Sequence, residues 1–218
     1  MSRSSEPTRA IPRACVGRLS LYLRRLETLQ SEGVVHVRSQ ALGESLGLTD
    51  TQVRKDLAVL GERLGHPGVG YDVSELIGAI RTTLGLDRVW YAALIGVGNL
   101  ARALLRYQGF RQRGFEVVCL FDADPNKVGE RIDQLVIYPM SELAYRRSQT
   151  QAELAILTVP GEAAQATAEH LIQAGFRGIL NFSPGVIRVP MGISLVNVDL
   201  TIQLEQLAFL VHGSIIEK

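Results

Sequence analysis

The sequence predicts an α/β protein with an N-terminal winged helix-turn-helix domain, a Rossmann-type domain with a parallel sheet, and a C-terminal helix. Two observations predict this fold class. A glycine-rich loop directly follows an apolar strand at residues 89–98, and two short helices separated by a glycine lie well before that strand. The first pattern is typical of dinucleotide-binding folds and the second of DNA-binding domains. The expected domains are residues 1–85, 86–198 and 199–218.

The composition gives few constraints on function. The chain has 218 residues, of which 46% are hydrophobic, and a formal net charge of +1. The overall charge does not indicate a nucleic acid or membrane partner. Any partner must therefore be inferred from individual segments of the sequence. Cys15 and Cys119 are far apart and outside any metal-binding motif, so neither a disulfide nor a metal site is expected. Without a leader or an apolar run of membrane-spanning length, the chain is expected to be cytoplasmic, with no membrane partner.

The glycine loop has the form Gly96-x-Gly98-x-x-Ala101 and opens a helix. In this pattern Gly96 permits a tight turn, Gly98 lets the backbone approach a pyrophosphate, and Ala101 lets the helix pack close to the sheet. The N-terminus of the helix then offers free N–H groups to the phosphates. The alternative is an ordinary junction between a strand and a helix.

An acidic residue, Asp122, follows the next apolar strand at residues 117–121, as dinucleotide-binding βαβ units require. Its carboxylate is expected to accept hydrogen bonds from the ribose hydroxyls and to repel a 2′-phosphate, which favours NAD(H) over NADP(H). The alternative role is a cap at the strand end. The predicted cofactor-binding residues are Gly96, Val97, Gly98, Asn99, Leu100, Asp122, Thr158, Val159, Pro160 and Asn181.

Strands and helices alternate through the rest of this part of the chain. Strands are expected at 136–138, 154–159, 178–182 and 195–198, and helices after Asp124-Pro125, at 141–147 and up to Ala174. Right-handed crossovers then give a parallel sheet. Leucines share one helical face in the final segment, 199–216, which is expected either to pack on its own domain or to cross to a second subunit.

The N-terminal part predicts three helices. The first spans 12–30, the second begins at Ser39 as its N-cap and ends at Gly47, and the third runs from the N-cap Thr49 to Leu60. Polar and cationic side chains on or beside the outward face of the third helix are suited to a DNA major groove; they are Thr51, Gln52, Arg54 and Lys55. The alternative is a three-helix bundle whose charged residues are only solvated.

Four glycines between residues 61 and 70 lead into a β-forming segment at 71–73. This composition predicts a β-hairpin, which beside a recognition helix would form a wing. His66 and Tyr71 are the predicted DNA-binding residues of the wing. A helix at 76–84 is expected to lead to the second domain.

Several blocks, taken in order, resemble the Rex family of redox-sensing transcriptional repressors. They are VRKDL at 53–57, GVGY at 68–71, LIGVGNLA at 94–101, FDADPNKVG at 121–129, AILTVP at 155–160, GILNFSP at 178–184 and NVDL at 197–200. The resemblance implies a homodimer that binds operator double-stranded DNA, binds NADH or NAD+, is released from DNA by NADH, and exchanges its C-terminal helix between subunits. It also implies a switch formed by Arg24 in the first helix, Tyr107 in the helix after the glycine loop, and Asp199.

Two segments depart from the pattern of that family. Residues 58–60 are Ala-Val-Leu where the family usually has Ser-Tyr-Phe, and His66-Pro67 replaces a basic pair before GVGY. Each lost phosphate contact lowers the slope of log affinity against log salt concentration by about 0.9. The departures therefore predict weaker or altered operator binding.

The competing interpretation is an NAD-dependent oxidoreductase. Hydride transfer to a carbonyl usually needs a proton donor near the nicotinamide, yet no histidine follows the end of a strand and Tyr107 has no neighbouring lysine. The chain is therefore expected not to be an enzyme and to have no catalytic residues. A nucleotide- or CoA-binding module without DNA binding is the third interpretation, because of the departures in the wing.

Overall fold

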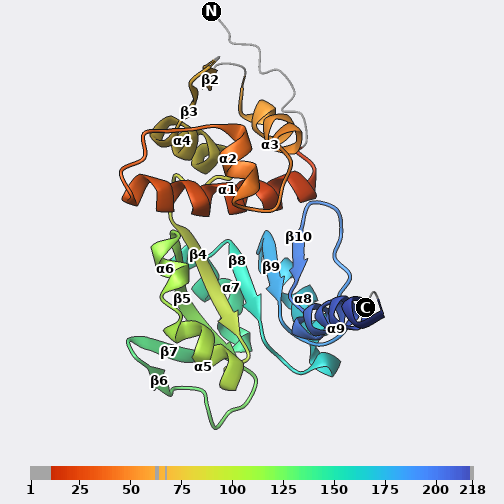
Figure 1. Cartoon of the computed structure of the whole chain (residues 1–218). Helices are drawn as coiled ribbons and strands as arrows, with labels where there is room; N and C mark the ends of the chain where they lie inside the picture. The colour runs from red at the N-terminus through yellow and green to blue at the C-terminus, as the bar shows by residue number, and fades with distance from the viewer. Residues whose placement is uncertain (1–10, 62–63, 67, 217–218) are drawn as a thin grey trace, which may run out of the picture. The chain divides into compact units, whose positions relative to one another are not determined.

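The computed structural model describes residues 11–61, 64–66 and 68–216, and the chain divides into two compact units, Met1–Arg88 and Val89–Lys218 (Figure 1). The boundary expected from the sequence, after residue 85, lies close to this division.

The N-terminal unit is a helical domain with a small antiparallel sheet. Its sheet has the strand order β1-β3-β2, so β3 pairs with both other strands. The elements are α1 (Arg13–Ser31), β1 (His36–Val37), α2 (Ser39–Glu44), α3 (Asp50–Leu57), a 3-10 helix (Ala58–Leu60), β2 (Gly65–His66), β3 (Gly70–Asp72) and α4 (Val73–Thr83). This is the predicted winged helix-turn-helix.

The helix boundaries of this unit correct two details of the prediction. Thr49 is the N-cap of α3, and its side chain accepts a hydrogen bond from the Gln52 N–H at 3.2 Å, as expected. Ser39 is not a cap: Arg38 occupies the N-cap of α2, and the Ser39 hydroxyl instead donates to the Asp50 carboxylate. The predicted third helix ends early, because its last turn is the 3-10 helix.

The wing forms as predicted, and a further strand, β1, pairs with it. At Gly70 φ is +109°, and a Cβ there would lie 2.5 Å from the Val37 carbonyl oxygen of β1. Gly70 therefore permits both the backbone turn and the close approach of β1 to β3. A strand as short as β1 has too few residues for a recognisable alternation. The strand predicted at 71–73 ends at Asp72, which instead caps α4 by accepting the Glu75 N–H at 2.9 Å. Pro67 lies outside the described residues.

The C-terminal unit contains a seven-stranded sheet of order β10-β9-β8-β4-β5-β7-β6, in which all neighbours are parallel except β6 and β7. The strands are β4 (Trp90–Ile95), β5 (Phe115–Asp122), β6 (Arg131–Ile132), β7 (Leu135–Pro139), β8 (Leu154–Leu157), β9 (Gly178–Asn181) and β10 (Ser194–Asn197). The helices are α5 (Asn99–Arg106), α6 (Gly109–Gln112), a 3-10 helix (Met140–Glu142), α7 (Leu143–Thr150), α8 (Gly161–Gln173) and α9 (Leu200–Ile216).

Both faces of this sheet are buried. Along β4, Ala93 and Ile95 belong to one apolar cluster, while Ala92 and Leu94 belong to another. Because successive side chains of a strand point to opposite faces, the two clusters lie on opposite sides of the sheet. This explains the continuous apolar run that marks β4 in the sequence.

Two local predictions for the C-terminal unit are wrong, and one short strand is missed. Residues 125–129 form a turn instead of a short helix, and Asp124 accepts the Asn126 N–H at 2.9 Å within it. The short strand β6 was not predicted. Tyr107 is not inside a helix: α5 ends at Arg106, and Tyr107 follows with extended backbone. Its ring packs edge-on against Phe110 at 5.3 Å between centroids.

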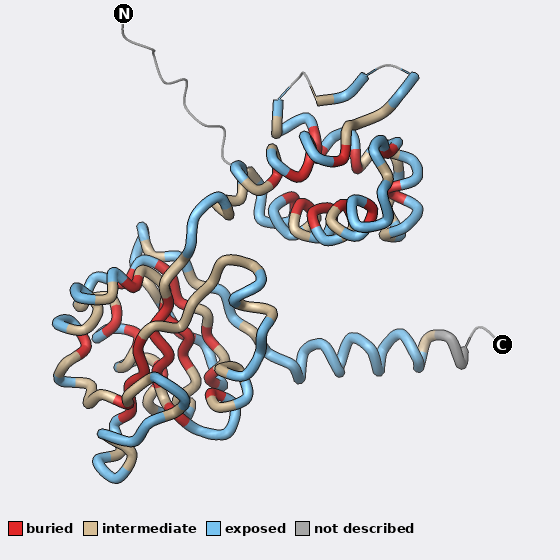
Figure 2. Tube along the Cα trace, turned by 90° about the vertical axis from the view of Figure 1, so that its left-hand side faces the viewer, coloured by how far each residue is buried: buried red, intermediate tan, exposed pale blue. Residues whose placement is uncertain are grey.

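Helix α9 is exposed from residue 200 to residue 212, including its apolar side chains (Figure 2). Phe209, for example, is 74% exposed. Within the described part of the chain, no helix is long and apolar enough to cross a membrane, and no group of three metal-ligating side chains gathers. Cys15 and Cys119 are both buried and free.

Candidate cofactor site and nucleic-acid interface

The glycine loop connects β4 to α5 and requires glycine at its first position. Gly96 has φ of +86°, and an added Cβ would lie 2.8 Å from Cγ1 of Val159 and 3.0 Å from the Thr158 carbonyl oxygen. The Thr158 hydroxyl donates to the carbonyl oxygens of Gly96 at 2.7 Å and Ile95 at 3.0 Å. The chain after β8 is therefore held directly against the loop.

The second glycine of the loop has a different environment. Gly98 is the N-cap of α5, and none of the described atoms lies within 4 Å of the position a Cβ would occupy. Packing within the chain therefore does not require glycine there. Asn99 and Leu100 follow in the exposed first turn of α5, where backbone N–H groups have no partner within the helix. The arrangement leaves space and donors for an anionic group.

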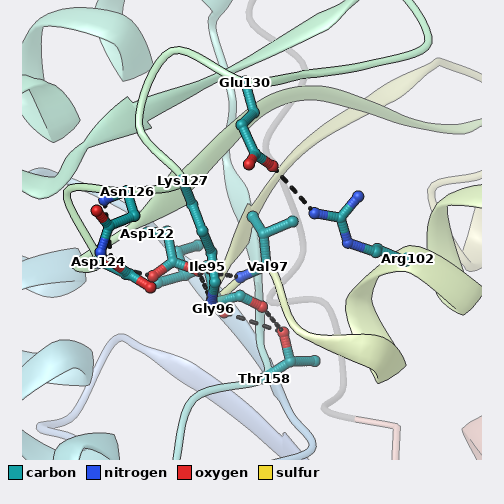
Figure 3. A network of polar contacts seen from close by, with 10 residues as sticks. All are labelled: Ile95, Gly96, Val97, Arg102, Asp122, Asp124, Asn126, Lys127, Glu130 and Thr158. Carbon is teal, nitrogen blue, oxygen red and sulfur yellow. Dashed lines mark hydrogen bonds and ion pairs between the residues drawn. The ribbon is translucent and has the colours of Figure 1, made fainter.

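Asp122 closes the other side of the loop at the end of β5 (Figure 3). The buried carboxylate accepts the Val97 N–H at 2.7 Å, the Asp124 N–H at 2.9 Å and the Lys127 ammonium at 3.0 Å. Burial by itself would raise the pKa of Asp122, but these hydrogen bonds outweigh it and hold the pKa below its usual value. Asp122 therefore remains charged and links the glycine loop to the turn that follows β5.

A cavity of about 640 Å³ lies at the carboxyl ends of the central strands, where ligands bind in open parallel sheets. Seven predicted cofactor residues line it: Gly96, Gly98, Leu100, Asp122, Thr158, Val159 and Pro160. Val97, Asn99 and Asn181 are not among its lining residues. Asn181 is buried, and its amide donates to the Ser183 carbonyl and the Asn197 side chain.

The cavity also contains residues that the sequence reasoning missed. Asp124 and Lys127 line the side of the cavity that carries Asp122, which we call its acidic side. Met140, Thr167 and Phe182 contribute to its walls. Phe182 lies in the segment 181–184, which the sequence predicts to border the nucleotide, but it is not one of the ten named cofactor residues. Met140 and Thr167 carry no sequence signal, because only the packing of the segment after β7 and of α8 brings them to the cavity.

The exposed side of α3 carries the side chains predicted to bind DNA. Thr51, Arg54 and Lys55 are exposed, and Arg54 forms an ion pair with Asp50 at 2.9 Å. Gln52 is half-buried and donates its amide to the Asp56 carboxylate at 2.9 Å. Because a carboxylate only accepts, the Gln52 NH2 group must face Asp56.

Asp56 is a buried acid on the recognition helix that the sequence reasoning did not single out. Its carboxylate accepts two hydrogen bonds from the Arg18 guanidinium, one from the Tyr22 hydroxyl at 2.8 Å and one from Gln52. Although burial opposes ionisation, these bonds lower the pKa of Asp56 to about 2. Asp56 therefore ties α3 to α1.

The wing carries the exposed His66, whereas Tyr71 is half-buried, and its ring lies 3.2 Å from where a Cβ on Gly65 would be. Arg38 adds a cation that the sequence reasoning missed: its guanidinium donates to the Gly68 carbonyl oxygen at 3.3 Å. Only the pairing of β1 with β3 brings this arginine to the wing.

The proposed switch residues are all exposed. Arg24 lies on α1 in the N-terminal unit, Tyr107 between α5 and α6, and Asp199 directly before α9. The Asp199 carboxylate accepts the Thr201 N–H at 2.9 Å. Neither Arg24 nor Tyr107 is needed to fill the core of its own unit. Tyr107, for example, is 60% exposed.

The fold and site together define a two-domain transcriptional regulator, with a winged helix in one unit and a Rossmann-type site in the other. The chain matches the family "Putative DNA-binding protein N-terminus" at residues 10–58 and the family "CoA binding domain" at residues 87–185. The chain belongs to the Rex family of redox-sensing transcriptional repressors. It is 43% identical to the Rex protein of Carboxydothermus hydrogenoformans over 199 residues, which is 91% of this chain and 95% of the relative.

Other members of the family are similar to this chain over nearly its whole length. The Rex protein of Chloroflexus aggregans is 41% identical over 209 residues, covering 96% of each chain. Among solved structures, the Rex-family repressor RSP in complex with NADH is 31% identical with a TM-score of 0.86, covering 95% of this chain and 97% of its own. RSP in complex with NAD+ and operator DNA is 32% identical with a TM-score of 0.89, covering 95% of each chain.

Proposed function

We propose that this chain is a transcriptional repressor that binds operator double-stranded DNA, binds NADH and NAD+, and is released from DNA by NADH. The open space beside Gly98 is the observation that best supports the proposed binding of a dinucleotide. A glycine that packing does not require stands at the start of α5, beside a cavity at the ends of the strands. A pyrophosphate needs such open space and the N–H groups next to it.

The proposed dinucleotide site comprises the ten residues expected from the sequence, with Gly96 fixing the turn and Gly98 leaving room for the phosphates. Val97 would act through its hydrogen bond to Asp122, and Asn99 and Leu100 through their backbone N–H groups. A bound dinucleotide supplies a nicotinamide whose oxidation state the protein senses. The protein makes and breaks no bond in it, and we propose no enzymatic activity.

The proposed DNA interface consists of Thr51, Gln52, Arg54 and Lys55 on α3 and His66 and Tyr71 in the wing. Lys55 and Arg54 are suited to phosphates or base edges, and Tyr71 supports the hairpin from within. Arg38 joins this interface, because its guanidinium lies at the wing in a protein that lacks the usual basic pair there.

We further propose a homodimer. The apolar side chains of Leu204, Leu207 and Phe209 on α9 are each more than half exposed, and a second copy would bury them. The coupling between cofactor and DNA would involve Arg24, Tyr107 and Asp199. Sedimentation of the full chain tests the dimer, and a monomer at micromolar concentration would contradict it.

Operator titration tests the central proposal. DNA selected from random oligonucleotides is titrated with the protein alone, with NAD+ and with NADH. NADH must bind the DNA-free form more tightly, because a ligand shifts an equilibrium only by its differential affinity. By linkage, operator DNA then weakens NADH binding by the same factor, commonly about 5–150-fold. Superimposable titrations with and without NADH would contradict the proposal.

The match to the CoA binding domain family favours one alternative, a CoA-binding module. Displacement of bound NADH by CoA at a comparable concentration would support that alternative. We expect CoA not to displace NADH.

A further inference from the structure

The acidic side of the cavity contains two aspartates with different environments. Asp122 uses its carboxylate within the protein: Oδ2 accepts the Val97 N–H and the Lys127 ammonium, and Oδ1 accepts the Asp124 N–H (Figure 3). Its side chain is 9% exposed. Asp122 therefore has little free acceptor capacity for a ligand, and its main role is to position the glycine loop and the turn after β5.

The charge of Asp122 is also compensated. The Lys127 ammonium lies 3.0 Å from Oδ2, so the pair is close to neutral for a group entering the cavity. The repulsion of a 2′-phosphate that the sequence analysis assigned to Asp122 is weakened by this neighbour, because opposite charges at this distance largely cancel at the ligand.

Asp124 has the features that Asp122 lacks. It lines the same cavity and is half-buried. Its Oδ1 accepts the N–H and the side-chain amide of Asn126 at 2.9 and 3.0 Å, whereas within the described residues Oδ2 has no partner. Its backbone N–H bonds to Asp122, so the residue is held in place. Asp124 therefore offers a positioned carboxylate oxygen, and no ion pair with a described cation compensates its charge.

We infer that Asp124, and not Asp122, selects a ribose diol over a ribose 2′-phosphate in the cofactor of this protein. A free carboxylate oxygen can accept a hydroxyl hydrogen of the diol, and its charge repels a phosphate at the same place. The inference rests on the proposed binding of NAD(H) and names the residue that discriminates against NADP(H).

The test measures the dissociation constants of NADH and NADPH by their fluorescence, without DNA, for the wild type and two variants. Asp124→Asn keeps the Oδ1 acceptor and removes the charge, and we expect it to lower the NADPH/NADH ratio of dissociation constants by about tenfold or more. Asp122→Asn weakens the hydrogen bonds that hold the loop, and we expect it to weaken the binding of both dinucleotides with little change in their ratio.

Asp133→Asn is the matched control, because it removes the same charge from an exposed turn between β6 and β7 and tolerates its φ of +52°. Its ratio should equal that of the wild type. Normal NADH binding by Asp124→Asn with an unchanged ratio would overturn the inference alone, as would a ratio that shifts only in Asp122→Asn. Failure of the wild type to bind either dinucleotide would overturn the proposed function together with the inference.

Discussion

The hydroxyl of Tyr22 donates to the buried carboxylate of Asp56 at 2.8 Å, so a phenol from α1 supports an acid on the recognition helix. Tyr22 is fully buried, and burial together with Asp56 raises its pKa. The recognition helix is thus fixed by a polar contact inside an apolar core.

Replacing Tyr22 by Phe removes this hydrogen bond and leaves the ring in place. We expect the free energy of unfolding to fall by about 1–3 kcal/mol, because a buried acceptor loses one of its donors. Chemical denaturation measures the change. Tyr145→Phe removes a hydroxyl from an exposed ring and is the control, with a change within about 0.5 kcal/mol. Equal stabilities of the two variants would contradict the role of Tyr22.

Asp56 also predicts a pH dependence of stability. Its pKa is lowered to about 2 in the folded protein, so its contribution to stability is complete above the unfolded value near 3.8 and is lost as the pH falls through about 2. Unfolding followed from pH 6 to pH 2 should show this loss. Asp56→Asn should flatten the acid limb relative to the wild type, and an identical limb in both proteins would contradict the assignment.

The two glycines of the loop should respond differently to substitution. Gly96→Ala introduces a side chain at positive φ where Val159 and Thr158 leave no room, so we expect a lower melting temperature. Gly98→Val faces open space, so we expect near-normal unfolding and no detectable NADH binding. Calorimetry and NADH titration of both variants test this contrast. Wild-type NADH affinity in Gly98→Val would place the pyrophosphate elsewhere.

Arg38 and Lys55 are expected to contact DNA phosphates. Replacing either by Ala should weaken operator binding and lower the slope of log affinity against log salt by about 0.9. Arg131→Ala removes the same charge from the exposed β6 of the other unit and should change neither quantity. An unchanged slope in Arg38→Ala would mean that Arg38 contacts no phosphate and only stabilises the wing through its hydrogen bond to Gly68.

Asp199 is expected to affect the coupling between NADH and DNA more than NADH binding itself. Asp199→Ala loses both the charge and the bond to the Thr201 N–H, while Asp199→Asn keeps an acceptor for that bond. We expect both variants to reduce the effect of NADH on operator affinity. A loss confined to Asp199→Ala would assign the effect to the start of α9 instead of the charge.

Local sequence patterns are enough to predict the two kinds of domain, the glycine loop and the outward face of α3. These features depend on local rules: an apolar run with a glycine turn, a capping threonine, and the spacing of leucines on a helix. Membership in the family followed from ordered blocks along nearly the whole chain.

Which polar groups are free and which already have hydrogen-bond partners depends on the folded chain. Asp122 and Asp124 are both acids after the same strand, and the sequence favoured the first; the fold gives Asp122 three donors and leaves an oxygen of Asp124 without one among the described residues. Asp56 and Arg38 acquire their partners from residues more than 25 positions away. Hydrogen-bond satisfaction depends on such long-range contacts, which the local spacing of residues does not encode.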